Sequence, residues 1–153
     1  MKKWIKRIAY FLLLGLIIIQ FFPGEKPAVS TDNPGDIHNE VLVNPEVSGI
    51  LKAACYDCHS NETKYPWYAS VAPVSWLVIH DTNEGRDELN FSEWATYSAK
   101  RKHHKLEEVI EMVEEGEMPL AVYNITHPEG RLTDAQIEAL ISWAKERMEE
   151  ITL

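Results

Sequence analysis

The chain has 153 residues, a length that accommodates one domain and a targeting segment. Its 15 basic and 24 acidic residues give a formal net charge of −9, and four of the basic residues fall within the first seven positions. The rest of the chain carries 11 basic and 24 acidic residues, so its net charge is near −13. This negative charge repels phosphate, which excludes nucleic acid as a partner.

The N-terminus has the pattern of a membrane segment. Four cationic residues between positions 2 and 7 precede an uncharged run over residues 8–24. As a helix this run spans about 25 Å, slightly less than the hydrocarbon core of a bilayer and near the upper limit for a signal peptide. We expect residues 1–24 to form an uncleaved single-pass anchor in the inner (cytoplasmic) membrane rather than a cleaved signal. The basic flank places the body on the periplasmic side.

The rest of the chain divides into a tether and a domain. Residues 25–44 are rich in Pro, Asp, Asn and Gly, which is typical of a flexible tether. The domain is expected over residues 45–153. Pro45 suits a first helical turn, and apolar residues follow at helical spacing into Cys55. No stretch of useful length alternates between apolar and polar residues, so the predicted fold class is all-α.

The two cysteines of the chain stand in the sequence Cys55-Tyr56-Asp57-Cys58, which His59 follows directly. On a helical turn both sulfurs lie on one side, where each thiol can add to one haem vinyl group, and His59 turns toward the iron. This C-x-x-C-H pattern is typical of c-type haem attachment. We therefore predict one covalent haem c per chain, with His59 as an iron ligand.

Three other uses of the cysteines are open. A structural zinc site needs four ligands, and no pair of histidines has the spacing to complete one. A redox-active dithiol is expected beside a βαβ unit, which the sequence does not predict. A structural disulfide across two intervening residues is strained and closes almost no loop.

Residues 60–73 indicate irregular structure. We expect Tyr65, Pro66, Trp67 and Tyr68 to wall the haem pocket, with a backbone carbonyl of this segment orienting the His59 ring. The alternative is that these aromatic side chains are simply core.

Three helices are predicted in the second half. The first covers about residues 74–80 and ends in a turn over residues 81–85. The second is opened by Asn90 with Glu93 in a capping box, breaks near residues 100–105 and closes at Gly116. The last is capped by Thr133, with Gln136 three residues on and an apolar stripe behind it.

The sixth iron position has several candidates. Met118 lies just past a predicted helix end, and Pro119 stiffens the loop, as suits a thioether ligand. The competing reading is that Met118 only packs. Other candidates are an open iron and four histidines, of which the first is expected to be packed or capping and the rest exposed: His80, His103, His104 and His127. His38, in the tether, is discounted.

Three stretches, CYDCHSNETKYPWY, ELNFSEW and KLEEVIEMVEEGEMPL, are together similar to the haem-binding-domain family of small, membrane-anchored bacterial proteins. The resemblance covers about residues 45–148. It implies a compact helical domain similar to monohaem cytochromes c. Within it, Cys55, Cys58 and His59 match the attachment motif, and Met118 matches a Met-Pro segment. The resemblance implies no physiological role, because the family is named for its motif.

Electron transfer is the leading functional hypothesis, because the domain is small, its sequence predicts a single haem, and it contains no nucleophile–base pair. The acidic surface suits a redox partner protein with a basic docking patch. The alternative is a haem-based sensor or small-ligand-binding module with a labile sixth position. A peroxidase needs an open iron and a distal acid/base pair, so we expect no enzyme.

Overall fold

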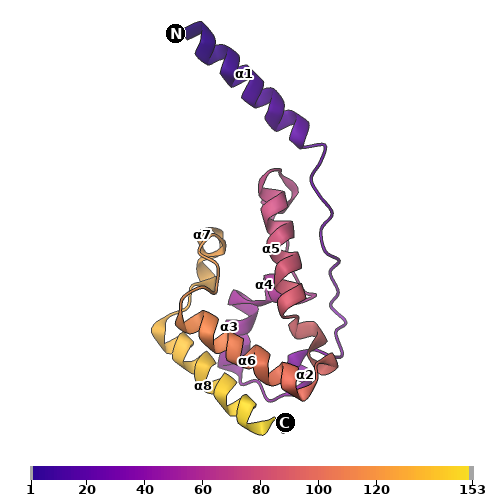
Figure 1. Ribbon diagram of the computed structural model, residues 1–153, viewed down its shortest axis with the longest axis vertical. Coiled ribbons are helices and arrows are strands. Elements are labelled where there is room, and N and C mark those ends of the chain that lie inside the picture. The colour runs from indigo at the N-terminus through magenta and orange to yellow at the C-terminus, as the bar shows by residue number, and fades with distance from the viewer. Residues whose placement is uncertain (1, 152–153) are drawn as a thin grey trace.

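A computed structural model describes residues 2–151, and within these residues the chain forms helices without strands. The expected all-α class is thus confirmed. Figure 1 labels the α-helices. Their bounds, with those of three short 3-10 helices, are α1 (Lys2–Ile19), α2 (Ile37–Glu40), α3 (Pro45–Ala54), α4 (Tyr56–His59), η1 (Trp67–Ser70), α5 (Val74–Glu88), η2 (Phe91–Thr96), α6 (Ala99–Glu114), α7 (Tyr123–Thr126), η3 (Pro128–Gly130) and α8 (Asp134–Glu150).

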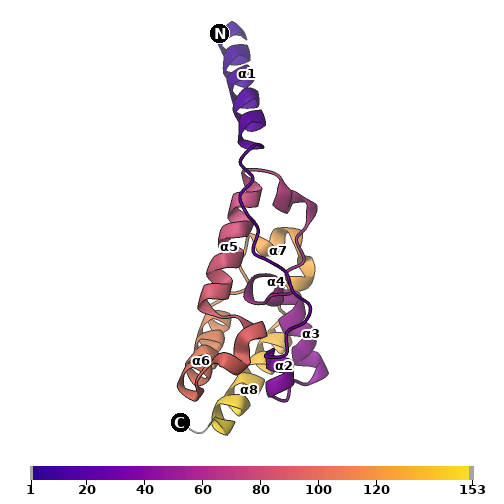
Figure 2. The same ribbon diagram turned by 90° about the vertical axis from the view of Figure 1, so that its right-hand side faces the viewer.

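The core lies where α6 and α8 pack side by side and α3 packs across α8 (Figures 1 and 2). Leu106 of α6 and Leu140 of α8 are fully buried there, together with Leu51 of α3. Removing such side chains from water supplies about 25 cal/mol per Å² of apolar area, which is the main stabilising contribution. The single turn of α4 contacts α3 and packs against α5.

Local signals place several helix ends correctly. Asn44 caps α3 by accepting from Val47 N, and Pro45 occupies its first turn. Thr133 and Gln136 form the predicted capping box of α8. Gly116 follows the end of α6 with φ +73°, a conformation that glycine adopts without steric cost.

The helix expected over residues 74–80 is longer than predicted. Instead of turning at residues 81–85, α5 continues to Glu88. Thr82 and Gly85 are buried in this extension. A Cβ on Gly85 would lie 2.8 Å from the Cys58 carbonyl oxygen. The polar, turn-like composition of residues 81–85 is therefore overridden by a close contact with α4.

The helix predicted to start at Asn90 is two elements. Asn90 caps η2 by accepting from Ser92 N. After a kink at Tyr97, Ser98 caps α6 by accepting from Arg101 N. The expected break over residues 100–105 is wrong, because α6 passes through them and buries Lys105 and Leu106.

Helix α1 extends away from the body in both views (Figures 1 and 2). Its apolar side chains are exposed, so it is not a core helix. In the described part of the chain, no helix has the length and apolar composition needed to cross a membrane. The expected transmembrane helix is therefore unsupported: the cationic residues lie within α1, and its uncharged part, residues 8–19, spans about 18 Å.

Part of the expected tether, and Gln20 at the end of the expected anchor, lie on the body. The Gln20 side chain bonds both the backbone N–H and the carbonyl of Ala72, at 3.1 and 2.9 Å. Arg86 donates to the carbonyl of Ala28 at 2.7 Å. Ile37 is 0% exposed and belongs to the core. Packing of the domain thus begins before residue 45.

Candidate functional site

Cys55 lies between α3 and α4, and Cys58 lies within the single turn of α4. The backbone N–H of His59 donates to the Cys55 carbonyl at 2.8 Å, and this hydrogen bond closes the turn. Cys55 packs at the edge of the core, and Cys58 lines a hollow. The same turn carries both thiols and the imidazole, whereas only Cys58 of the three lines the hollow.

The His59 ring is oriented by a backbone carbonyl from a distant part of the chain. Its Nδ1 lies 3.0 Å from the Leu89 carbonyl oxygen, directly after α5. Donation of the Nδ1 proton there leaves Nε2 as the free ligand nitrogen. Burial lowers the pKa of His59, which keeps the ring neutral and able to bind a metal. The expectation that residues 65–68 supply the carbonyl is therefore wrong.

Both thiols are held in the protonated form. Burial raises the pKa of Cys55 to about 12, with a further contribution from Cys58. Burial and then the charge of Asp57 raise the pKa of Cys58 to about 11. Redox-active dithiols depend on a lowered thiol pKa, so the dithiol alternative is disfavoured.

Both cysteines are free thiols, not a disulfide. Within residues 2–151, no group of three or more His, Cys, Asp or Glu side chains could hold a metal ion, so the zinc alternative is unsupported.

A hollow of about 360 Å³ opens beside Cys58. One wall is α5, through Val74, Leu77 and Val78, and the opposite wall is the segment around α7, through Leu120 and Val122. Its lining is mainly apolar, and its size falls in the range of cofactor pockets, about 300–1,000 Å³.

The aromatic segment after His59 forms the floor of the hollow. Tyr65, Pro66 and Tyr68 line it, as expected, whereas Trp67 points outward and is 80% exposed. None of the four is a fully buried core residue, so the alternative of simple core aromatics does not hold.

Met118 is half-buried in the loop after α6, in the predicted position. Its backbone N–H donates to the Met112 carbonyl at 3.1 Å. Met118 does not line the hollow; the lining of that wall begins at Leu120. Met118 thus precedes the wall residue Leu120 by two positions and is not itself part of the lining.

Of the four other candidate histidines, two are exposed and one lines the hollow, while His103, expected to be exposed, is half-buried on α6. His80 is exposed, contrary to expectation, and His104 is exposed beside Glu107 and Glu108. His127, expected at the surface, is half-buried and lines the hollow, where its ring stacks on Tyr123 at 4.1 Å. The apolar hollow and the aromatic stack account for this burial.

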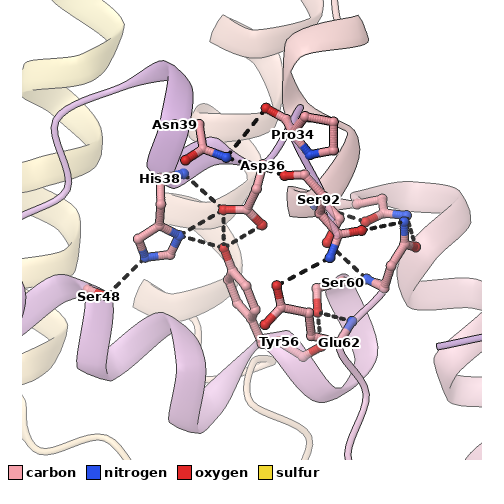
Figure 3. A network of polar contacts seen from close by, with 12 residues as sticks. Pro34, Asp36, His38, Asn39, Ser48, Tyr56, Ser60, Glu62 and Ser92 are labelled. Carbon is pink, nitrogen blue, oxygen red and sulfur yellow. Dashed lines mark hydrogen bonds and ion pairs between the residues drawn. The ribbon is translucent and has the colours of Figure 1, made fainter. Parts of the chain in front are cut away.

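A polar network that the sequence did not indicate surrounds the Tyr56 hydroxyl (Figure 3). The hydroxyl of Tyr56, between the two cysteines, donates to the buried Asp36 carboxylate at 2.9 Å. Nδ1 of His38 lies 2.9 Å from the same oxygen of Asp36, and Nε2 lies 3.0 Å from Ser48 Oγ. The nearest signal in the sequence was Ile37, an apolar residue within a polar stretch.

A helical domain that places Cys58 in the lining of an apolar hollow, with Cys55 and an oriented His59 imidazole on the same turn, has the parts of a haem-binding module. The model of the haem-binding-domain family matches residues 14–146, and the chain belongs to this family. The chain is therefore a haem-binding protein. No curated protein and no solved structure matches it.

The residues present fit a haem. Free Cys55 and Cys58 thiols, a neutral His59 with one nitrogen free, and an apolar hollow are what the group requires. The sequence predicted no role for three residues that bond to this site: Leu89 with His59, and Tyr123 with Asp57.

Proposed function

We propose that the chain binds one haem c covalently through thioether bonds from Cys55 and Cys58, with His59 Nε2 as an iron ligand. The observation that carries this proposal is the His59–Leu89 hydrogen bond at 3.0 Å, which fixes the ring on the turn that bears both thiols. A ring held in one tautomer loses little freedom when it binds a metal.

Intact mass after expression with c-type haem maturation tests the attachment. The unmodified protein should carry one haem that survives denaturation. In Cys58→Ser, covalent attachment should fall sharply, with only the Cys55 bond left. Haem that is fully extractable from the unmodified protein would contradict covalent attachment while leaving haem binding intact.

We propose Met118 as the sixth ligand and electron transfer as the function. A haem iron exchanges single electrons, and methionine ligation raises its reduction potential. Met118 is supported by its half-buried loop position and by its backbone bond to α6. The test is a reduced-minus-oxidised spectrum. It should show a trough where the red absorption band of Met–ferric haem is lost on reduction, and this trough should be absent in Met118→Ala.

A sensor or small-ligand-binding function is the second candidate, and one observation favours it. Met118 does not line the hollow, so the sixth position could be labile. Rapid binding of CO to the ferrous protein, together with absence of the methionine band, would select this function. We propose no enzymatic role; peroxide turnover by the purified protein would contradict that.

The proposed location is the inner membrane, with the haem domain on the periplasmic side, where bacteria attach haem c. Exposed apolar side chains on α1, such as Phe11 and Leu12, and the basic residues before them support a targeting or anchoring role. Membrane fractionation with N-terminal mass analysis separates a retained anchor from a cleaved signal.

The proposed partner is a redox protein with a basic docking patch, because the chain carries a net charge of −9. Its association rate with such a partner should fall steeply as ionic strength rises. A rate independent of salt would contradict electrostatic docking.

A further inference from the structure

We propose that Tyr123 and Asp57 form a latch that holds the segment over residues 118–127, here called the distal segment, against the haem-attachment turn. The Tyr123 hydroxyl oxygen lies 3.0 Å from Asp57 Oδ2 and 3.1 Å from the Ala53 carbonyl oxygen. Both are positioning residues. This inference rests on the proposed function in that the distal segment carries the sixth ligand.

The latch joins two parts of the site that are 66 residues apart in sequence. Tyr123 has one proton to donate, and both acceptors belong to the attachment segment, so either bond ties the same two parts together. The Asp57 carboxylate is itself fixed, because its other oxygen accepts from Lys64 N at 3.0 Å. A charged acceptor makes the stronger bond.

The Tyr123 ring is held on both sides. His127 stacks on it with 9° between the ring planes. The backbone of Gly130 also approaches it closely, so that a Cβ there would lie 2.7 Å from Tyr123 Cε1. These contacts aim the hydroxyl at α4.

The distal segment has few other ties to the body. Helix α7 packs mainly on η3, and its ribbon stands apart from that of α5 in Figure 1. The Tyr68 hydroxyl lies 2.8 Å from Thr126 Oγ1 and 3.5 Å from His127 Nε2, and Arg131 Nε donates to the Asn124 carbonyl at 3.0 Å. Loss of the Tyr123 bond should therefore loosen the segment locally.

Met118 is bracketed by two fixed points. Before it, the chain is held to α6 by its bond to Met112; after it, the next strong tie is Tyr123. Releasing the latch should free one side of the loop and make the sixth position labile, while the attachment turn keeps its own bonds.

Tyr123→Phe in the full-length haem protein tests the latch. Tyr65→Phe is the matched control, since its hydroxyl also lies at the hollow but bonds the Pro27 carbonyl. The amides of Asn124 and His127, bonded within the distal segment, should exchange hydrogen about fivefold faster in Tyr123→Phe alone, the size expected for one lost hydrogen bond. Ferrous CO binding should also accelerate, with covalent haem content unchanged.

Asp57 variants provide a rescue. Asp57→Asn can accept from Lys64 N and donate to the Tyr123 oxygen while Tyr123 donates to Ala53, so its exchange should remain slow. In Asp57→Ala the amides of the distal segment should exchange fast, and adding Tyr123→Phe to this variant should increase the exchange rate little further. Unchanged amide exchange in Tyr123→Phe would overturn the latch. Absence of the methionine band in the unmodified protein would instead overturn Met118 ligation, and the exchange measurement still reports on the latch.

Discussion

Tyr56 stands between Cys55 and Cys58, yet its side chain is not part of the lining of the hollow. It is 4% exposed, its ring stacks on Phe91 with 10° between the planes, and its hydroxyl bonds both oxygens of Asp36. A buried carboxylate is costly unless it is hydrogen-bonded. Tyr56 therefore supplies a hydrogen bond to Asp36 and fixes the turn over residues 55–59 to it.

Tyr56→Phe should lower the free energy of unfolding by about 2 kcal/mol, because the Asp36 carboxylate loses a buried donor. Urea titration of the haem protein measures this loss. Tyr65→Phe, at a half-buried site, is the comparison and should cost less than about 1 kcal/mol. Equal losses in the two variants would count against the network.

The same residue predicts a pH dependence. Burial, followed by the charge of Asp36, raises the pKa of Tyr56 in the folded state. Its contribution to stability is thus complete below about pH 10, the ordinary tyrosine pKa, and is lost as pH rises above it, because the unfolded chain then releases this proton more readily. The stability difference between Tyr56→Phe and the unmodified protein should shrink above that pH in urea titrations. If the stability difference between the two proteins grew above pH 10, the predicted direction of the pH dependence would be wrong.

At the scale of elements, the contact between α4 and α5 sets the shape of the site. It positions Cys58 at the hollow and leads the chain to Leu89, which orients His59. Gly85 makes the contact possible, since a side chain there would meet the backbone of Cys58. Backbone atoms cannot move aside as a flexible side chain can.

Gly85→Ala should destabilise the domain by about 2 kcal/mol through overpacking, despite the better helix propensity of alanine. Gly49→Ala is the matched control within α3, where a Cβ meets nothing within 4 Å. It should stabilise by about 0.5–1 kcal/mol. Thermal unfolding of both variants measures the contrast, and similar shifts in both would contradict the α4–α5 contact.

At the scale of the whole molecule, the chain joins an exposed helix to a packed body through a segment that lies along the body. Helix α1 contributes little to the core, whereas residues from Gln20 onward bond to the body and Ile37 is buried in it. The family match from residue 14 covers this segment as well.

Truncation should separate these parts, provided each variant carries the same cleavable export sequence. Deleting residues 1–19 should leave the urea midpoint of the haem protein unchanged. Deleting residues 1–37 should lower stability by about 3 kcal/mol or more, since the Ile37 site is emptied and the Asp36 partner of Tyr56 is lost. A stable domain after the longer deletion would contradict the role of the docked segment.

The sequence alone determined the features whose physics is local. Cys55, Cys58 and His59 share one turn because their spacing matches the helical repeat, and Thr133 and Gly116 mark helix ends through bonds with near neighbours. The all-α class followed from periodicity in the same way. Met118 as a ligand stays a prediction.

Only the tertiary structure decided which distant groups meet. The extension of α5 through a turn-like stretch depends on Gly85 against Cys58, and the orientation of His59 depends on Leu89, 30 residues away. The Tyr56–Asp36 and Tyr123–Asp57 bonds join residues 20 and 66 positions apart. Such pairings are set by burial and by the need to satisfy buried polar groups, and these quantities exist only once the whole chain has packed.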